Sequence, residues 1–194
     1  MRRITFQNLI VAALSLFVVG TASAATIGFS PASQTVAVGD FLSVDLVISD
    51  LGGEIVSAYD LDVVYDASIL SAVSVSFGPL LGDELLFEVF NDYDLSVPGL
   101  VDLAQLSLLS DAQLLALQGG DSFVLATLGF DAVGLGTSSL DFVFDAFNDI
   151  KGMNAQPLEI VAQSGAASAV PEPSAAVVFA LGAAVVAAGI RRRT

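Results

Sequence analysis

Short runs of alternating apolar and polar residues constrain the fold of this chain more than any other feature of its sequence. A period of two places successive side chains on opposite faces of a strand, so each run predicts a strand with one buried and one hydrated face. Turn signals such as Gly78-Pro79 separate the runs. Many such strands predict an all-β sandwich. The expected strands lie at residues 42–48, 59–65, 73–77, 85–90, 100–108, 124–130 and 140–144.

Two segments between residues 25 and 170 do not follow this alternation. Residues 110–118 predict one short helix, which Ser110 or Asp111 can cap and which Gly119 can end in the left-handed conformation. Residues 162–170 are mostly small or polar. We expect them to form a flexible linker that follows a folded domain at residues 25–161.

The side-chain chemistry excludes several functions. The chain contains no histidine and no cysteine, so Cys/His zinc sites, thiol nucleophiles and disulfides are ruled out. Its 21 acidic and 6 basic residues give a formal charge of −15, which argues against nucleic-acid binding. Five of the six basic residues lie at the two ends of the chain, and only Lys151 lies between them. The middle of the chain is therefore more acidic than the total indicates.

The N-terminal segment has the pattern of a secretory signal peptide. Arg2 and Arg3 precede an apolar stretch at residues 9–19, and small residues follow it. We expect residues 1–24 to be removed by signal peptidase after Ala24, with Ala22 and Ala24 as the small residues of the site. Cleavage after Ala25 is the alternative.

The C-terminal segment predicts a transmembrane helix. Residues 175–190 carry no charge and would span about 24 Å as a helix, slightly less than the apolar core of a bilayer. The terminal Arg191, Arg192 and Arg193 are expected to remain on the cytoplasmic side. All preceding residues would then lie outside, in agreement with a signal peptide.

The motif before this helix is more specific. Pro171, Glu172 and Pro173 precede an apolar helix and a terminal arginine cluster, and the whole of residues 171–194 resembles a PEP-CTERM sorting signal. This resemblance implies transient anchoring in the inner membrane and processing by a membrane-embedded exosortase. It also implies delivery to the cell surface or the extracellular polysaccharide matrix, with the three motif residues acting in recognition rather than catalysis.

The middle of the chain resembles a cohesin domain of the kind found before PEP-CTERM tails. The resemblance covers residues 27–161 and depends on the order of several motifs. It implies a nine-stranded β-sandwich of jelly-roll topology and the docking of an extracellular partner that carries a calcium-binding dockerin module. The motifs are Phe29-Ser30-Pro31-Ala32, Val36-Ala37-Val38-Gly39-Asp40, the aspartate-rich run from Tyr59 to Asp66, Ile69-Leu70, and the run from Phe144 to Asp149.

Paired carboxylates are the only catalytic candidates, and in so acidic a chain such pairs are expected by chance. They are Asp60 with Asp62, Asp92 with Asp94, and Asp145 with Asp149. We therefore expect no enzyme and no required cofactor. An EF-hand is excluded at residues 92–103 because Val97 stands at the position of the required turn glycine and Leu103 at that of the bidentate glutamate.

One calcium site stays open in the sequence, formed by Asp145, Asn148 and Asp149. The alternative is that these side chains cap local turns.

Protein docking through one face of the sandwich is the leading functional hypothesis. The alternatives are binding of an extracellular polysaccharide and a structural role in the biofilm matrix. Polysaccharide sites usually expose aromatic rings, but the chain has no tryptophan, and Tyr59 and Tyr65 share the parity of core residues. Tyr93 is the tyrosine expected to be free. Apolar residues on outward parity, among them Val47, Val64 and Leu86, favour a protein partner.

Overall fold

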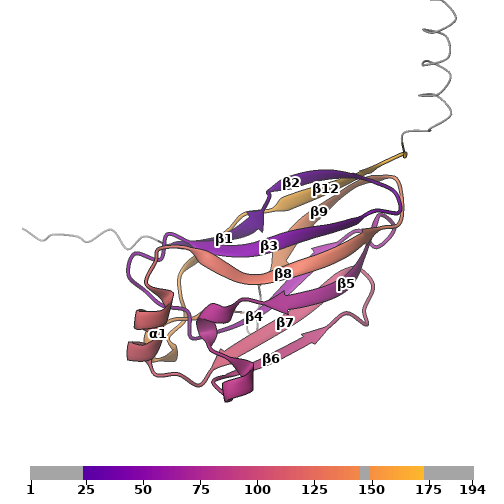
Figure 1. The fold of residues 1–194 in the computed structure, drawn as a ribbon. Helices are drawn as coiled ribbons and strands as arrows, with labels where there is room; N and C mark the ends of the chain where they lie inside the picture. The colour runs from indigo at the N-terminus through magenta and orange to yellow at the C-terminus, as the bar shows by residue number, and fades with distance from the viewer. Residues whose placement is uncertain (1–23, 145–148, 173–194) are drawn as a thin grey trace, which may run out of the picture.

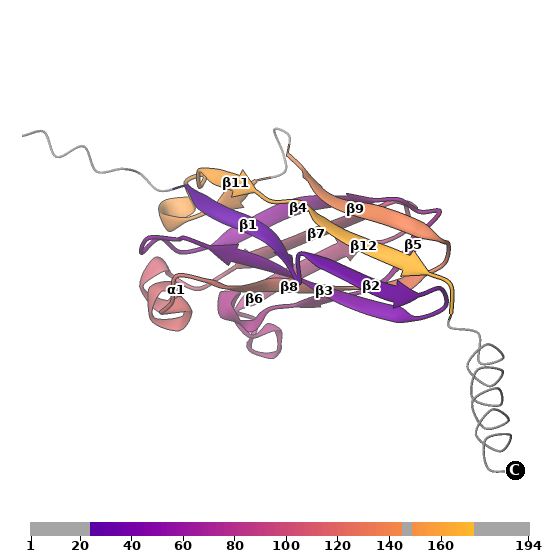
Figure 2. The ribbon, with the colours of Figure 1, turned by 90° about the horizontal axis from the view of Figure 1, so that it is seen from above.

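The alternating runs form strands that pair into two facing sheets (Figure 1). A computed structural model of the chain describes residues 24–144 and 149–172. The described part begins near the α-helix at residues 111–118 and ends at the opposite end of the sandwich (Figures 1 and 2). The first sheet contains, in spatial order, β11 (Ile160–Ala162), β1 (Ala25–Ser30), β3 (Phe41–Ser49), β8 (Phe123–Ala132) and β5 (Leu70–Phe77).

The second sheet forms the other layer of the sandwich. Its strands are, in spatial order, β2 (Ser33–Ala37), β12 (Gly165–Val170), β9 (Gly136–Val143), β4 (Ala58–Tyr65), β7 (Leu100–Ser107) and β6 (Val89–Asp94), and the short β10 (Ile150–Lys151) also pairs with β4. Most pairs are antiparallel, whereas β1 with β11 and β2 with β12 are parallel. The first and last strands of the described chain are thus held by the sheets and not by local hairpins.

The core lies between the inner faces of the two sheets. Along β3 every second side chain is buried, from Leu42 to Ile48, as the period of two predicts. Tyr59 is also buried, and its hydroxyl donates to the Leu125 carbonyl across the sandwich at 3.1 Å. Burial raises the pKa of this phenol well above its ordinary value. Each fully buried leucine contributes about 1.5–3 kcal/mol through removal from water.

The predicted helix is confirmed as α1 (Asp111–Gln118). Gln113 Oε1 accepts from the Ser110 N–H at 3.0 Å and so satisfies the start of the helix. At its end, Gly119 has a φ of 3°, so the predicted left-handed conformation is wrong. Gln118 holds α1 against the segment between β3 and β4, because its amide accepts from the Val56 N–H at 2.8 Å and donates to the Val56 carbonyl at 2.6 Å.

The predicted strand at residues 85–90 is wrong over most of its length. The Asp83 carboxylate accepts the Leu85 N–H at 2.8 Å and starts the short 3-10 helix η2 (Glu84–Leu86). Phe87 then takes a left-handed conformation with a φ of 57°, and β6 begins only at Val89. A side chain that caps the local backbone therefore overrides the apolar pattern. Two other 3-10 helices are η1 (Pro79–Leu81) and η3 (Met153–Ala155).

The linker predicted at residues 162–170 is also wrong, because β12 occupies most of it. Ala167 and Ala169 are buried, and β12 pairs with β2 on one side and β9 on the other. The described chain contains twelve strands and not about nine. The additional strands are short or built from small residues, and their pairing partners are distant in sequence.

The predicted targeting segments lie largely outside the described residues. This holds for Ala22, Pro173, the helix at residues 175–190, and Arg191, Arg192 and Arg193. Within the described ranges, the structure contains no helix that is long and apolar enough to cross a membrane.

Candidate functional site

The outer surface of β4, β7 and β6 combines an apolar row with acidic rows. Cross-strand register places Ala58 opposite Leu106, and Leu106 opposite Phe90. Phe90 is 61% exposed on the edge strand β6, and Leu106 is 50% exposed on the neighbouring strand β7. We call this surface the β4–β7–β6 face. Apolar side chains that stay exposed on a rigid sheet mark an interaction surface.

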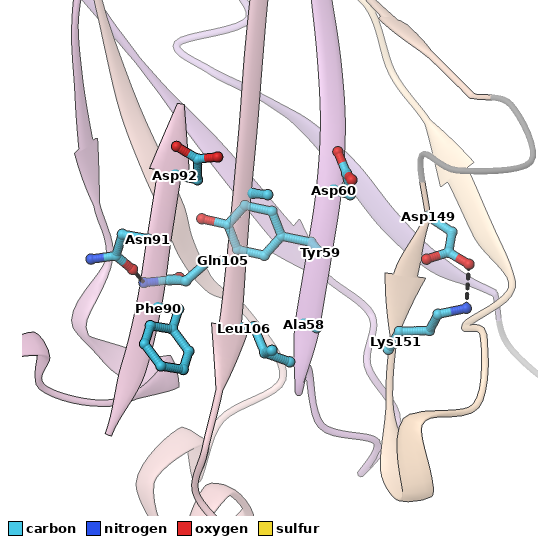
Figure 3. A pocket seen from close by; sticks show the side chains of 11 residues that line it. Ala58, Tyr59, Asp60, Phe90, Asn91, Asp92, Gln105, Leu106, Asp149 and Lys151 are labelled. Carbon is cyan, nitrogen blue, oxygen red and sulfur yellow. Dashed lines mark hydrogen bonds and ion pairs between the residues drawn. The ribbon is translucent and has the colours of Figure 1, made fainter. Parts of the chain in front are cut away.

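A shallow pocket of about 330 Å³ lies over this apolar row (Figure 3). Phe90 and Leu106 line it from neighbouring strands, and Asp60 and Asp92 line it farther along the sheet. On its far side, Lys151 forms an ion pair with Asp149 (Figure 3). The pocket therefore has an apolar floor and charged edges, an arrangement suited to an apolar side chain with polar neighbours.

Two acidic rows cross the same face beside the pocket. In the first row, Asp60 and Asp92 flank Ala104. In the second, Asp62 and Asp94 lie directly opposite Asp102 on either side. Partial burial raises the pKa of Asp102, and repulsion from the carboxylates of both rows raises it further. The face consequently has a strong negative potential next to its apolar row.

Removal of the central charge is expected to stabilise the fold at neutral pH. Because the folded-state pKa of Asp102 is raised, its ionisation costs stability as the pH rises through that pKa. We expect Asp102→Asn to increase the free energy of unfolding by about 0.2–1 kcal/mol at pH 7, the range for cross-strand pairs. The gain should disappear below the ordinary aspartate pKa of about 3.9.

Urea denaturation at pH 7 and pH 3 measures this effect, with Asp131→Asn on β8 as the control. A variant that is less stable than the wild type at pH 7 would contradict the proposed repulsion between the rows.

The predicted calcium residues are only partly described. Asp145 and Asn148 lie outside the described residues, and Asp149 pairs with Lys151. Within the described ranges, no group of three or more acidic side chains is arranged to hold a metal ion. The remaining carboxylate pairs, Asp60 with Asp62 and Asp92 with Asp94, project from one open face. Glycoside hydrolysis instead requires two carboxyl groups on either side of a scissile bond.

Cohesin modules are among the solved structures with a similar fold. The sixth cohesin of scaffoldin B from Acetivibrio cellulolyticus, solved in complex with a Cel5 dockerin, matches with a TM-score of 0.60 and 13% identity over 76% of this chain and 100% of the cohesin chain. The non-cellulosomal cohesin from Archaeoglobus fulgidus matches with a TM-score of 0.58 and 15% identity over 79% of this chain and 96% of its own. This chain has the cohesin fold.

The seventh ScaB type I cohesin of Pseudobacteroides cellulosolvens gives a similar result, with a TM-score of 0.58 and 17% identity over 78% of this chain and 95% of its own. No protein-family model matches the sequence, and no curated protein matches it. The cohesin-like β-sandwich expected from the sequence is thus confirmed at the level of the fold.

The cohesin fold brings together residues that the sequence analysis treated separately. The prediction that Asp60 and Asp62 lie on the outer side of a strand is confirmed by the burial of their neighbours Tyr59 and Leu61. Tyr93 is exposed as predicted, and it lies on β6.

The outward residues named in the sequence differ in exposure. Leu86 is exposed, whereas Val47 and Val64 are only partly so. Phe90 and Leu106 were not recognised as site residues, because only the register between β6 and β7 places them side by side. The one sign of them in the sequence is that both residues alternate with buried residues and so point outward from their strands.

Proposed function

We propose that this chain is an exported, non-catalytic binding module that docks an extracellular protein on the β4–β7–β6 face. The observation that carries the proposal is the exposed pair of Phe90 and Leu106 next to two rows of aspartates. Interfaces combine an apolar or aromatic anchor with a polar rim, and this face supplies both. The acidic rows favour a partner that presents lysine or arginine beside an apolar side chain.

The proposed partner is a protein with a dockerin-type module. Support comes from the fold, since several structures with this arrangement of strands were solved as cohesin–dockerin complexes. A polysaccharide is the alternative ligand.

Affinity capture from the native extracellular fraction tests the proposal. The full-length chain serves as bait beside a Phe90→Ser, Leu106→Ser double variant and a Leu135→Ser control, which removes another exposed leucine. We expect one protein species to bind the wild type and the control but not the double variant. Equal recovery on all three baits would contradict docking on this face, and recovery of polysaccharide alone would favour the alternative.

The proposed export route begins with cleavage of residues 1–24. β1 starts at Ala25, which is buried and donates its N–H to the Glu159 carbonyl at 2.9 Å. Cleavage after Ala24 would leave this strand complete, whereas cleavage after Ala25 would remove its first residue. The structure-derived boundary therefore favours the first alternative.

The proposed sorting signal follows the last strand without a spacer. β12 ends at Val170, and Pro171 and Glu172 follow directly. Processing by an exosortase must then cut after Val170 to keep β12 intact, and the processed domain would extend from residue 25 to at least residue 170. The mature protein would reach the cell surface or the polysaccharide matrix.

We expect Pro171→Ala, Pro173→Ala to block this processing. An immunoblot of membrane and extracellular fractions should then show a larger, membrane-retained form. Release of a product with wild-type mobility would contradict the assignment.

A further inference from the structure

A second pocket lies at the edge of the sandwich, between β6, the two 3-10 helices η1 and η2, and α1. Its volume is about 410 Å³, within the range of small-molecule sites. Its apolar wall includes Phe77, Pro79 and Leu117. Its polar lining includes Asn91 and Gln105, whose parity along β6 and β7 is opposite to that of Phe90 and Leu106. Asn91 and Gln105 also line the pocket over the apolar row, whereas Phe90 and Leu106 do not line this second pocket.

Gln105 gives this pocket a buried acceptor without a partner. The residue is 2% exposed, and its Oε1 has no hydrogen-bond partner among the described residues. Its Nε2 donates to Asn91 Oδ1 at 2.8 Å, and Asn91 Nδ2 donates to Glu84 Oε2 at 3.0 Å. A buried carbonyl oxygen without a donor destabilises the folded state, and a ligand that supplies the donor removes that cost.

The orientation of both amides follows from the carboxylate at the end of this chain of bonds. An ionised carboxylate only accepts, so Asn91 must turn its NH₂ group toward Glu84. Its oxygen then faces Gln105, which must in turn present its own NH₂ group. A flipped Gln105 would place two oxygens against each other. Gln105 Oε1 is therefore fixed as the acceptor that needs a donor from outside the network.

The loop at the pocket adds three carboxylates. Asp83, Glu84 and Glu88 line the pocket, and the loop that carries them is closed by hydrogen bonds. The Asp83 N–H donates to Glu88 Oε2 at 3.1 Å, and the Glu88 N–H donates to the Asp83 carbonyl at 3.1 Å. Lys151 is the only basic residue in the described ranges, and it pairs with Asp149. The described residues thus supply no cation to this loop.

We propose that this pocket binds an alkylammonium group. Its polar lining offers acceptors, namely Gln105 Oε1 and three carboxylates. The NH₂ group of Gln105 already donates to Asn91 Oδ1, and that of Asn91 already donates to Glu84. An ammonium group has three donors and no acceptor, so it matches such a lining. Phe77 and Leu117 would pack against the aliphatic stem. The group can come from a free amine or from a lysine side chain of a docked protein.

Calorimetric titration of the full-length chain in a nonionic detergent tests the proposal. The probes are 1,5-diaminopentane, Nα-acetyl-lysine methylamide and neutral pentan-1-ol at low ionic strength. We expect at least one amine to bind and pentan-1-ol not to bind. Binding of the diamine alone would indicate a free amine as the natural ligand, and binding of the lysine derivative would indicate a protein side chain. Absence of binding by both amines would overturn the proposal.

Matched variants locate the site. Glu84→Gln, Glu88→Gln keeps the side-chain shapes but removes two charges, and we expect it to weaken amine binding at least about tenfold, as for loss of a charge-assisted bond. Gln105→Met removes the buried acceptor and should weaken binding similarly. If Gln105→Met does not fold, the variant Glu84→Gln, Glu88→Gln alone tests the location of the site. The assignment of the amine site to this pocket would be contradicted if Glu84→Gln, Glu88→Gln bound the amine like the wild type. An equal loss of amine affinity in a Glu54→Gln control would also contradict it. We expect amine binding to be unchanged in the variant Phe90→Ser, Leu106→Ser. A failure of the amine proposal can therefore be told apart from a failure of the docking proposal.

Discussion

The variant Ala167→Asp is expected to lose about 3–5 kcal/mol of folding free energy, the cost of an unpaired charge in the interior. Ala167 is 1% exposed and lies in the middle of β12, between β2 and β9. An aspartate there must either stay protonated or displace the strand from the core. Urea denaturation of the full-length chain in a nonionic detergent, followed by circular dichroism, measures the loss.

Ser168→Asp is the matched control for this effect. Ser168 is the next residue of β12 and points to the other side of the sheet, where its hydroxyl bonds to that of Thr137 at 2.8 Å. We expect the control to lose less than about 1 kcal/mol, the typical value of one exposed hydrogen bond. If residues 162–170 were a linker, both variants would unfold like the wild type. Equal midpoints for Ala167→Asp and the wild type would therefore contradict the position of β12.

The strands with strong alternation could be predicted from the sequence, and those without it could not. β3 and β4 combine large apolar residues with polar neighbours, so the local pattern alone marks them. β12 consists of glycine, alanine, serine and valine, which give little contrast between its faces. Its buried alanines are explained by parallel pairing with β2, more than 120 residues earlier in the chain. Such pairing is a long-range property that a short sequence window does not contain.

The candidate site shows the same limit. The parity of Asp60 and Asp62 predicts an acidic outer surface, and the structure confirms it. The apolar row depends on the register of β6 against β7, which places Phe90 opposite Leu106. The alternation in the sequence predicts the strand before β7 at residues 85–90, whereas β6 begins at Val89. An error in the bounds of one strand was thus enough to hide the apolar row.

Loss of the apolar row is the second large effect that we expect. Phe90→Ser, Leu106→Ser removes both exposed apolar side chains from the pocket floor. Residues that anchor an interface contribute about 2 kcal/mol or more each, so affinity for the captured partner should fall at least about 100-fold. Isothermal titration calorimetry measures the change, and Leu135→Ser should bind like the wild type. The free energy of unfolding of the double variant should stay within about 1 kcal/mol of the wild-type value, since both residues are exposed.

A dissociation constant that changes less than threefold in the double variant would place the partner elsewhere. Salt provides a second measurement of the same surface. Because the acidic rows are exposed, the association rate with a basic partner should fall as ionic strength rises. An association rate independent of salt would contradict the role given to the aspartates.

Carboxyl footprinting tests the central claim most directly. A carbodiimide with a small amine labels exposed aspartates and glutamates, and mass spectrometry compares the full-length chain alone and with its captured partner. We predict that the partner protects Asp92, Asp94 and Asp102 on the β4–β7–β6 face and leaves Asp131 on β8 labelled as before. Protection of Asp131 with unchanged labelling of the three face aspartates would contradict docking on this face.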